Sequence, residues 1–169
     1  CKRIVDLYRA ENDKITDLWK ECDNALEDMM SWSHKKKSYS IGEHGVLFIS
    51  EHGICLPNGL YIRYKNLRNE DNKVTYDSRK GPVSIWGGAM VENVVQALAR
   101  IIVGEQMLAI KERYRPVLTV HDAAVIVVPK NELNEGLEFI TQVMSTPPTW
   151  AEGLPVACEA KYGESYGEC

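Results

Sequence analysis

The chain has 169 residues, of which 44% are hydrophobic, a size that suits one domain with a core of its own. Its formal net charge of -4 argues against a protein that binds nucleic acid through overall charge. No apolar run approaches the roughly 20 residues of a membrane span, and the first residues lack the pattern of a signal peptide.

Charge and cysteines are unevenly placed along the chain. Residues 34–80 carry nine Lys or Arg and five Asp or Glu, net +4, whereas residues 131–169 carry one Lys and seven Glu, net -6. A local basic surface is therefore compatible with the negative total. The five cysteines are scattered and odd in number, which indicates a reduced, cytosolic chain rather than a disulfide framework.

The first 86 residues predict helix followed by short strands. Residues 2–30 place apolar side chains on one helical face, and Asn12-Asp13 offers a cap that would divide them into two helices. Because the chain starts inside this pattern without a cap, we expect a larger protein to precede Cys1. Residues 31–45 are polar and predict a loop. Short strands are predicted around turns such as 57–59, at 46–50, 60–64 and 74–76.

The remaining residues predict a long helix, a hairpin and a shorter helix. Gly87-Gly88 precedes a broad apolar stripe at helical spacing, and it lacks the Lys-Ser/Thr of a phosphate-binding loop, so we interpret it as a structural turn. Asn131 can cap a helix that Pro147-Pro148 breaks, and residues 154–160 predict a last strand. This order favours an α+β fold with an antiparallel sheet.

Residues 117–128 contain the most informative pattern. Two apolar runs flank His121-Asp122, which predicts a tight hairpin buried on both faces with this polar pair in its turn. A carboxylate held there would need a compensating cation, and a divalent metal is a natural candidate. A plain turn aspartate is the alternative for Asp122, and a half-buried histidine bonded to backbone is the alternative for His121.

The hairpin and its surroundings resemble family A DNA polymerases, the DNA polymerase I family. Residues 119–123 resemble the motif C hairpin, which usually reads Val-His-Asp-Glu, and residues 56–59 resemble a Leu-Pro-Ser-Gly turn. Residues 4–9 and 15–19 are similar to the helices after motif B in phage members. Residues 87–100 match the phage-type helix before motif C, and residues 150–155 and 163–167 look like the C-terminal end. The resemblance follows the family order along nearly the whole chain.

The resemblance implies an architecture and a reaction. The fold would be an antiparallel palm sheet with the motif C hairpin packed against long helices, plus a small β insertion. Residues 1–30 would be helices leading from the fingers, residues 31–86 a loop and the insertion, and residues 87–169 the palm. The reaction would be template-directed deoxynucleotidyl transfer by a two-metal mechanism with Mg²⁺, in the cytoplasm of a bacterial host if the protein is phage-encoded. Partners would be the DNA template-primer, deoxynucleoside triphosphates and the N-terminal remainder of the polymerase, with no membrane.

The resemblance also assigns residues. Asp122 would be a metal ligand and His121 would support the primer end. Gln96 would face the template-primer duplex, with Asn93 and Arg100 beside it, whereas an ordinary polar helix face is the alternative. A lysine run is a further candidate for DNA phosphates, with a solvated loop as its alternative, and Arg63, Lys65 and Arg68 would extend that surface. The run comprises Lys35, Lys36 and Lys37.

Three departures from the family pattern limit these expectations. Ala123 replaces the usual glutamate, and Ile101 stands where phage members often carry an aspartate. The motif A aspartate and the lysine-bearing helix of motif B are absent, so we expect the isolated chain to be inactive, with a carboxylate outside it completing the metal site. A non-catalytic, palm-like DNA-binding remnant is the alternative. A nuclease-like metal domain would need more acids near Asp122, and His44, His52 and Cys55 do not have the spacing of a zinc finger.

Overall fold

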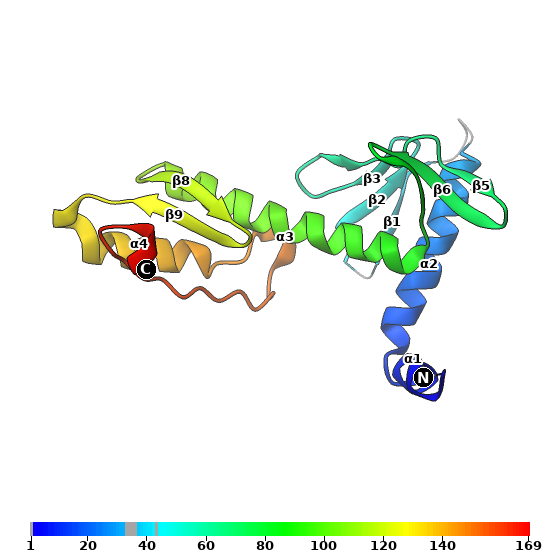
Figure 1. Cartoon of the computed structure of the whole chain (residues 1–169), viewed down its shortest axis with the longest axis horizontal. Coiled ribbons are helices and arrows are strands. Elements are labelled where there is room, and N and C mark those ends of the chain that lie inside the picture. The colour runs from blue at the N-terminus through cyan, green and yellow to red at the C-terminus, as the bar shows by residue number, and fades with distance from the viewer. Residues whose placement is uncertain (1, 33–36, 43) are drawn as a thin grey trace. The chain divides into compact units, whose positions relative to one another are not determined.

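The computed structural model describes residues 2–32, 37–42 and 44–169 (Figure 1). The chain forms two compact units, Cys1–Gln96 and Ala97–Cys169. Helices and antiparallel sheets occur together, which confirms the predicted α+β class. The expected division into three parts, at residues 30 and 86, stays a prediction.

Two helices open the first unit, as Asn12-Asp13 predicted. Helix α1 covers Lys2–Glu11 and α2 covers Asp13–Met30. The side chain of Asn12 does not cap α2; its Nδ2 donates to the carbonyl oxygen of Tyr8 instead, at 2.8 Å. The ten residues of α1 include no buried one, whereas α2 buries Cys22, Ala25 and Leu26. Only the second half of the predicted apolar face therefore contributes to the core.

Two small antiparallel sheets follow, with more strands than the sequence predicted. Sheet A has the order β1-β2-β3-β4 and sheet B has the order β5-β6-β7. The strands of sheet A are Tyr39–Ile41, Leu47–Ser50, Gly53–Cys55 and Tyr61–Ile62. Those of sheet B are Arg68–Glu70, Lys73–Ser78 and Gly81–Ser84. The prediction of a loop over 31–45 is wrong at β1, because a three-residue strand is too short to show an alternating pattern.

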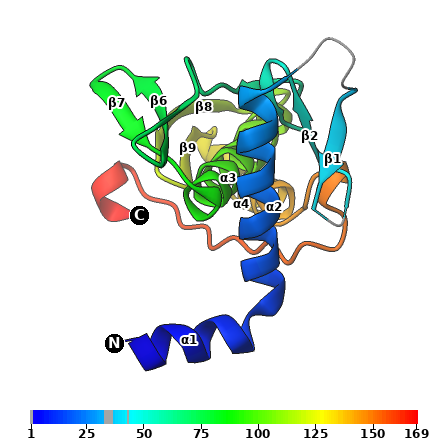
Figure 2. The ribbon, with the colours of Figure 1, turned by 90° about the vertical axis from the view of Figure 1, so that its right-hand side faces the viewer.

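One face of sheet A supplies the core of the first unit. Ile49 and Ile54 are paired across β2 and β3, and both are fully buried. The hydroxyl of Tyr39, in the same row, donates to Asp28 of α2 at 2.7 Å, which places this face toward α2 (Figure 2). The opposite face is therefore turned away from the core, because successive side chains of a strand alternate.

Helix α3 spans Gly87–Lys111, so it begins in the first unit and continues into the second. Its first residue packs on α2: the backbone N–H of Gly87 donates to Asp23 Oδ1 at 2.5 Å. Among the described helices, α3 has the length and the apolar composition that would allow it to cross a membrane. Core helices of other proteins meet the same criterion. Met90 and Ile110 are fully buried, but only 22% of the apolar window of α3 is buried within the structure.

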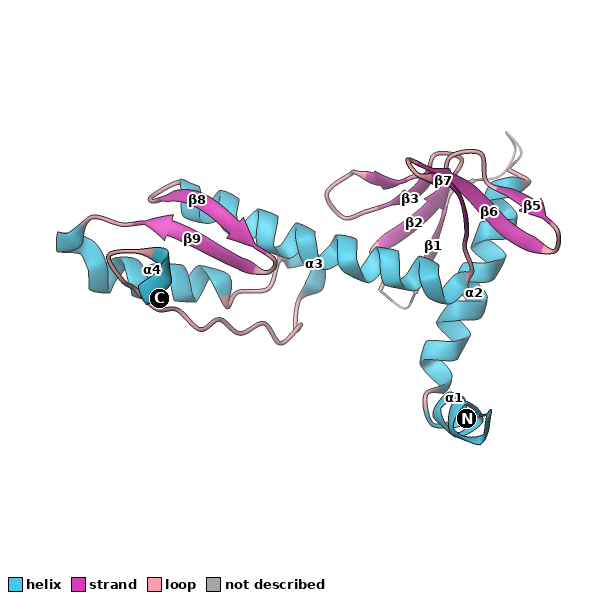
Figure 3. Cartoon of the chain, viewed as in Figure 1, coloured by secondary structure: helices cyan, strands magenta, loops and turns pink. Residues whose placement is uncertain are grey.

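The second unit contains the predicted hairpin and a shorter helix. Strands β8 (Arg115–Val120) and β9 (Ala123–Val127) pair antiparallel, and α4 covers Leu133–Met144. The predicted cap at Asn131 is wrong: a short 3₁₀ turn, Lys130–Glu132, comes first and Glu132 precedes α4. The predicted strand at 154–160 is also wrong, since these residues pair with no other described strand (Figure 3).

A buried glutamine joins α3 to the end of α4. Gln106 is 6% exposed, and its Nε2 donates to the carbonyl oxygens of Met144 at 2.9 Å and of Thr146 at 3.2 Å. The last carbonyl groups of a helix lack partners within the helix, and this amide supplies one. Gln106 is therefore a structural polar group within the core.

Replacing Gln106 by Met is expected to lower the free energy of unfolding by about 1–3 kcal/mol, because carbonyl groups near the end of α4 lose a buried donor. Urea unfolding followed by circular dichroism measures the change. Gln142→Met, on the exposed side of α4, is the matched control and should shift stability by less than about 0.5 kcal/mol. Equal effects of the two substitutions would contradict the assigned role.

Candidate active site

His121 and Asp122 form the two-residue turn of the β8–β9 hairpin, where the apolar flanks predicted them. Val120 and Ala123 are the last paired residues on either side. A register shift between Pro116 and Leu118 marks a bulge, which bends and twists a strand locally. The hairpin thus presents the two polar side chains at its end.

The backbone of His121 has a positive φ of 55°, whereas Asp122 is not among the positive-φ residues. Two-residue hairpin turns with positive φ only at the first central residue usually carry glycine there. A histidine in this conformation costs about 1–2 kcal/mol relative to the right-handed region. The turn therefore keeps an imidazole at a position where glycine would be less strained.

The prediction that the hairpin is buried on both faces is wrong. None of the residues of β8 or β9 is buried, and Val117, Leu118 and Val127 are 49–59% exposed. An apolar run predicts a strand but does not specify what covers it. Asp122 is exposed as well, so water can solvate its carboxylate and burial no longer requires a cation.

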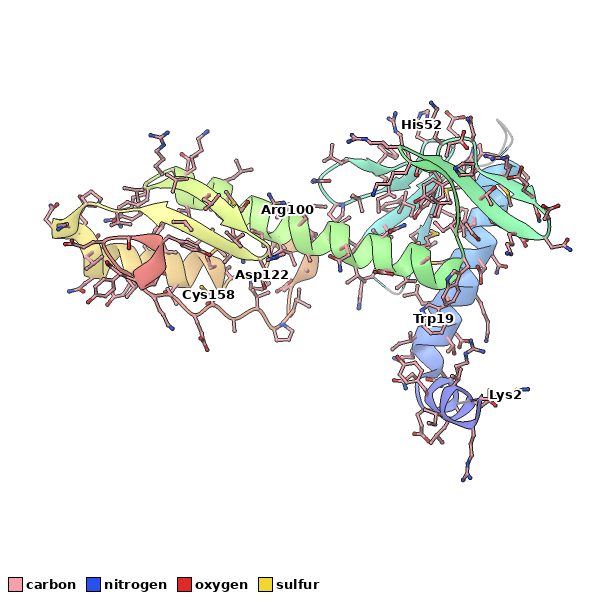
Figure 4. All side chains as sticks on the ribbon, in the orientation of Figure 1. Lys2, Trp19, His52, Arg100, Asp122 and Cys158 are labelled. Carbon is pink, nitrogen blue, oxygen red and sulfur yellow. The ribbon has the colours of Figure 1, made fainter. Side chains whose placement is uncertain are left out.

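The Asp122 side chain, labelled in Figure 4, has no hydrogen bond or ion pair with any residue of 2–32, 37–42 and 44–169. The same holds for His121 within those ranges. Within those ranges no three His, Cys, Asp or Glu side chains gather into a metal-binding group. The turn of the hairpin thus offers one accessible carboxylate, which fits a metal ligand but is not a metal site on its own. No zinc or nuclease-like cluster forms around it among the described residues.

The three candidates on α3 are exposed. Asn93 and Gln96 belong to the first unit and Arg100 to the second, all within one continuous helix. A separation of three residues places Asn93 and Gln96 on one side of α3 within the first unit. Asn93 Nδ2 donates to the hydroxyl of Tyr64 at 3.2 Å, and burial raises the pKa of that hydroxyl to about 12. Gln96 and Arg100 make no side-chain hydrogen bond within the described part of the chain.

The basic residues proposed to contact DNA differ in whether neighbouring acidic side chains offset their charge. Lys35 and Lys36 lie outside the described residues, and Lys37 is exposed before β1. Arg68 is engaged by acids: its Nη1 lies 2.9 Å from Asp77 and its Nη2 lies 3.2 Å from Glu70. Its contribution to a basic surface is therefore largely cancelled.

Sequence reasoning missed the contacts that hold the base of the hairpin. Tyr114 is 5% exposed and its hydroxyl donates to Glu132 at 3.0 Å; burial, then this bond, raises its pKa. Arg113 pairs with Glu135 at 2.6 Å and lies over the rings of Tyr114 and Phe139. A basic and aromatic pair directly before an apolar strand is the signal that could have indicated an anchoring point.

Comparison with known proteins supplies one informative similarity. The chain is 29% identical over 180 residues to a DNA polymerase of Bacillus phage SP02, an alignment that covers 96% of this chain and 26% of that polymerase. The chain thus spans about a quarter of the length of this curated relative. No protein-family model matches the chain, and no solved structure matches it.

Proposed function

We propose that the chain is the C-terminal part of a family A, phage-type DNA polymerase and carries the motif C side of its palm. The reaction would be template-directed transfer of deoxynucleotides to a primer. The observation that carries this proposal is the accessible Asp122 at the end of a two-residue hairpin turn. Similarity to a phage DNA polymerase over nearly the whole chain supports it.

Asp122 and His121 have separate roles in this proposal. Asp122 would supply one ligand for Mg²⁺, and a carboxylate outside this chain would complete the site. A bound divalent metal would stabilise the charge that develops on the phosphoryl group. His121 would donate a hydrogen bond at the primer end. The positive φ of His121 supports a side-chain role, because residues in strained backbone conformations cluster at functional sites.

The exposed side of α3 would contact the template-primer duplex. Gln96 makes no side-chain hydrogen bond with the described residues, and its amide suits minor-groove acceptors that are nearly the same for every base pair. Asn93 and Arg100 would lie beside it, and Lys37, with Lys35 and Lys36, would contact phosphates. The other partners would be deoxynucleoside triphosphates and the rest of the polymerase, in the cytoplasm of the phage host.

A DNA-binding remnant without catalysis is the second candidate. Ala123 removes one carboxylate beside Asp122, and the described residues build no metal-binding group by themselves. Both candidates keep the duplex contacts on α3. They differ in whether nucleotide incorporation occurs, so incorporation is the property to measure.

Primer extension separates the two candidates. Residues 1–169 alone are expected to extend a labelled primer no further than a mock purification does, because they supply only one accessible carboxylate at the hairpin. The product of the complete reading frame that contains the chain is expected to extend it in the presence of Mg²⁺. Extension by residues 1–169 alone would refute the shared metal site. Failure of the complete product to extend the primer, while it still binds duplex, would favour the remnant.

A further inference from the structure

The face of sheet A that is turned away from α2 carries exposed aromatic side chains. Phe48, Cys55 and Tyr61 are paired in register across β2, β3 and β4, and they form one row on that face. Phe48 is 44% exposed and Tyr61 is 37% exposed, whereas Ile49 and Ile54 in the next row are fully buried. We refer to the row Phe48, Cys55 and Tyr61 as the aromatic row.

Contacts on several sides hold the ring of Tyr61 in place. The ring of His52 meets it edge-on at 5.9 Å between centroids, and the guanidinium of Arg63 lies 5.9 Å from its centre. The neighbouring Cys55 thiol raises the pKa of the Tyr61 hydroxyl above its ordinary value. The ring is preorganised, which lowers the entropy lost when a planar ligand stacks on it.

The backbone beneath the row depends on a close approach between strands. Gly53 has a φ of 113°, and a Cβ atom at this position would overlap the carbonyl oxygen of Ile62. Neighbouring strands lie about 4.8 Å apart, so Phe48 and Tyr61 project from backbones about 10 Å apart. Two planar groups can therefore be accommodated, one on each ring.

The charges around the aromatic row are mainly positive. Lys37, Arg63 and Lys65 are exposed. The described acids beside them include Glu51 and Asp77, and the charge of Asp77 interacts with that of Lys65. Glu51 lies 3.6 Å from His52 and is partly compensated by it. Arg63 and Lys65 have no ion pair within the described ranges, in contrast to Arg68. A polyanion with exposed planar faces matches this combination of charge and aromatic surface.

We propose that the aromatic row of sheet A binds single-stranded DNA, with one base stacked on Phe48 and another on Tyr61 and with phosphates near Arg63 and Lys65. Unpaired bases offer their faces to aromatic side chains, whereas paired bases are already stacked within the duplex. The inference that the bound nucleic acid is DNA rests on the proposed polymerase function. The inference that this surface binds a nucleic acid rests only on the aromatic row and the charges around it. This surface belongs to the first unit, whereas the β8–β9 turn belongs to the second.

Binding to the chain of residues 1–169 tests the proposal directly. Fluorescence anisotropy of a fluorescein-labelled twelve-nucleotide oligo-dT is expected to report binding, with a blunt duplex of the same length competing less well. Phe48→Leu and Tyr61→Leu keep apolar volume but remove the ring, and each should weaken binding about tenfold, since one stacked base contributes roughly 1–3 kcal/mol. Tyr61→Phe should retain binding. Arg63→Gln should lower the slope of log affinity against log salt by about 0.7.

Matched controls separate the surface from general effects. Tyr162→Leu removes an aromatic side chain that is 59% exposed in the second unit and should leave binding unchanged. Glu152→Gln, at an exposed acid of the second unit, should also leave it unchanged. Because this binding is measured without nucleotide incorporation, its failure is distinguishable from failure of the polymerase proposal. Unaltered binding by the Phe48→Leu, Tyr61→Leu double variant, preference for duplex, or at least tenfold preference for oligo-rU would each overturn the proposal.

A second measurement uses the unsubstituted chain, so its result does not depend on whether a variant folds. Photocrosslinking of the unmodified chain to an oligonucleotide containing 5-bromodeoxyuridine, followed by mass spectrometry, should place crosslinks on peptides that contain Phe48 or Tyr61. Crosslinks confined to the second unit would overturn the assignment.

Discussion

Replacing Asp122 by Asn in the product of the complete reading frame is expected to reduce primer extension by about a thousandfold. Asn keeps the size of the side chain but removes the negative charge that would hold a divalent metal. A loss of about 4 kcal/mol of transition-state stabilisation corresponds to this factor, because each 1.36 kcal/mol changes a rate tenfold. Single-turnover incorporation of one deoxynucleotide measures the effect without product release.

The fold should tolerate this substitution. Asp122 is exposed and lacks a hydrogen bond or ion pair within the described ranges, so its replacement should change stability by less than about 0.5 kcal/mol. Affinity for the template-primer should also stay within about twofold. Reduced incorporation with unchanged unfolding and DNA binding would therefore report chemistry alone.

Glu152→Gln is the matched control for charge. Glu152 is another exposed acid of the second unit, and the proposal gives it no part in the reaction. Its replacement by Gln should leave incorporation unchanged, although it removes one negative charge, as Asp122→Asn does. If Asp122→Asn retains more than a tenth of the activity, Asp122 is not a metal ligand in this polymerase.

Local patterns predicted the elements with strong periodicity. The break at Asn12, the long helix from Gly87 and the turn at His121-Asp122 are all present where the sequence indicated them. The three-residue strands were missed because so few residues show no alternation. Residues 154–160 have an apolar pattern but pair with no described strand, since pairing depends on a neighbour that a local pattern does not specify.

Burial was the less predictable property. The apolar faces of α1 and of the β8–β9 hairpin resemble core faces in sequence, yet these elements contain no buried residue. Periodicity shows which side chains share a face, but the packing partner decides whether that face is buried. The same limit applies to the candidate site. The turn was predictable from its flanks, whereas the roles of His121 and Gln96 came from a family resemblance and stay predictions.

Replacing Gly87 by Ala is expected to destabilise the first unit by about 3 kcal/mol. Alanine normally favours a helix over glycine by about 1 kcal/mol. Here the added Cβ would overlap the carbonyl oxygen of Trp19 and lie 2.8 Å from the carbonyl carbon, so α2 and α3 must separate. Overpacking of this kind costs about 1–3 kcal/mol or more, and it would also disturb the hydrogen bond from Gly87 to Asp23.

Gly104→Ala in the same helix is a matched control with the opposite expected sign. A Cβ atom at Gly104 meets nothing within 4 Å, so the substitution should stabilise the protein by about 0.5–1 kcal/mol. Urea unfolding followed by tryptophan fluorescence would report on both units, because Trp19 and Trp86, which meet edge-on at 5.4 Å, lie in the first unit and Trp150 lies in the second. Hydrogen exchange of the α2 backbone should accelerate in Gly87→Ala alone. If both substitutions stabilised the protein, α2 and α3 would not be in close contact at Gly87. The contact that fixes the start of α3, the proposed DNA-contacting helix, would then be wrong.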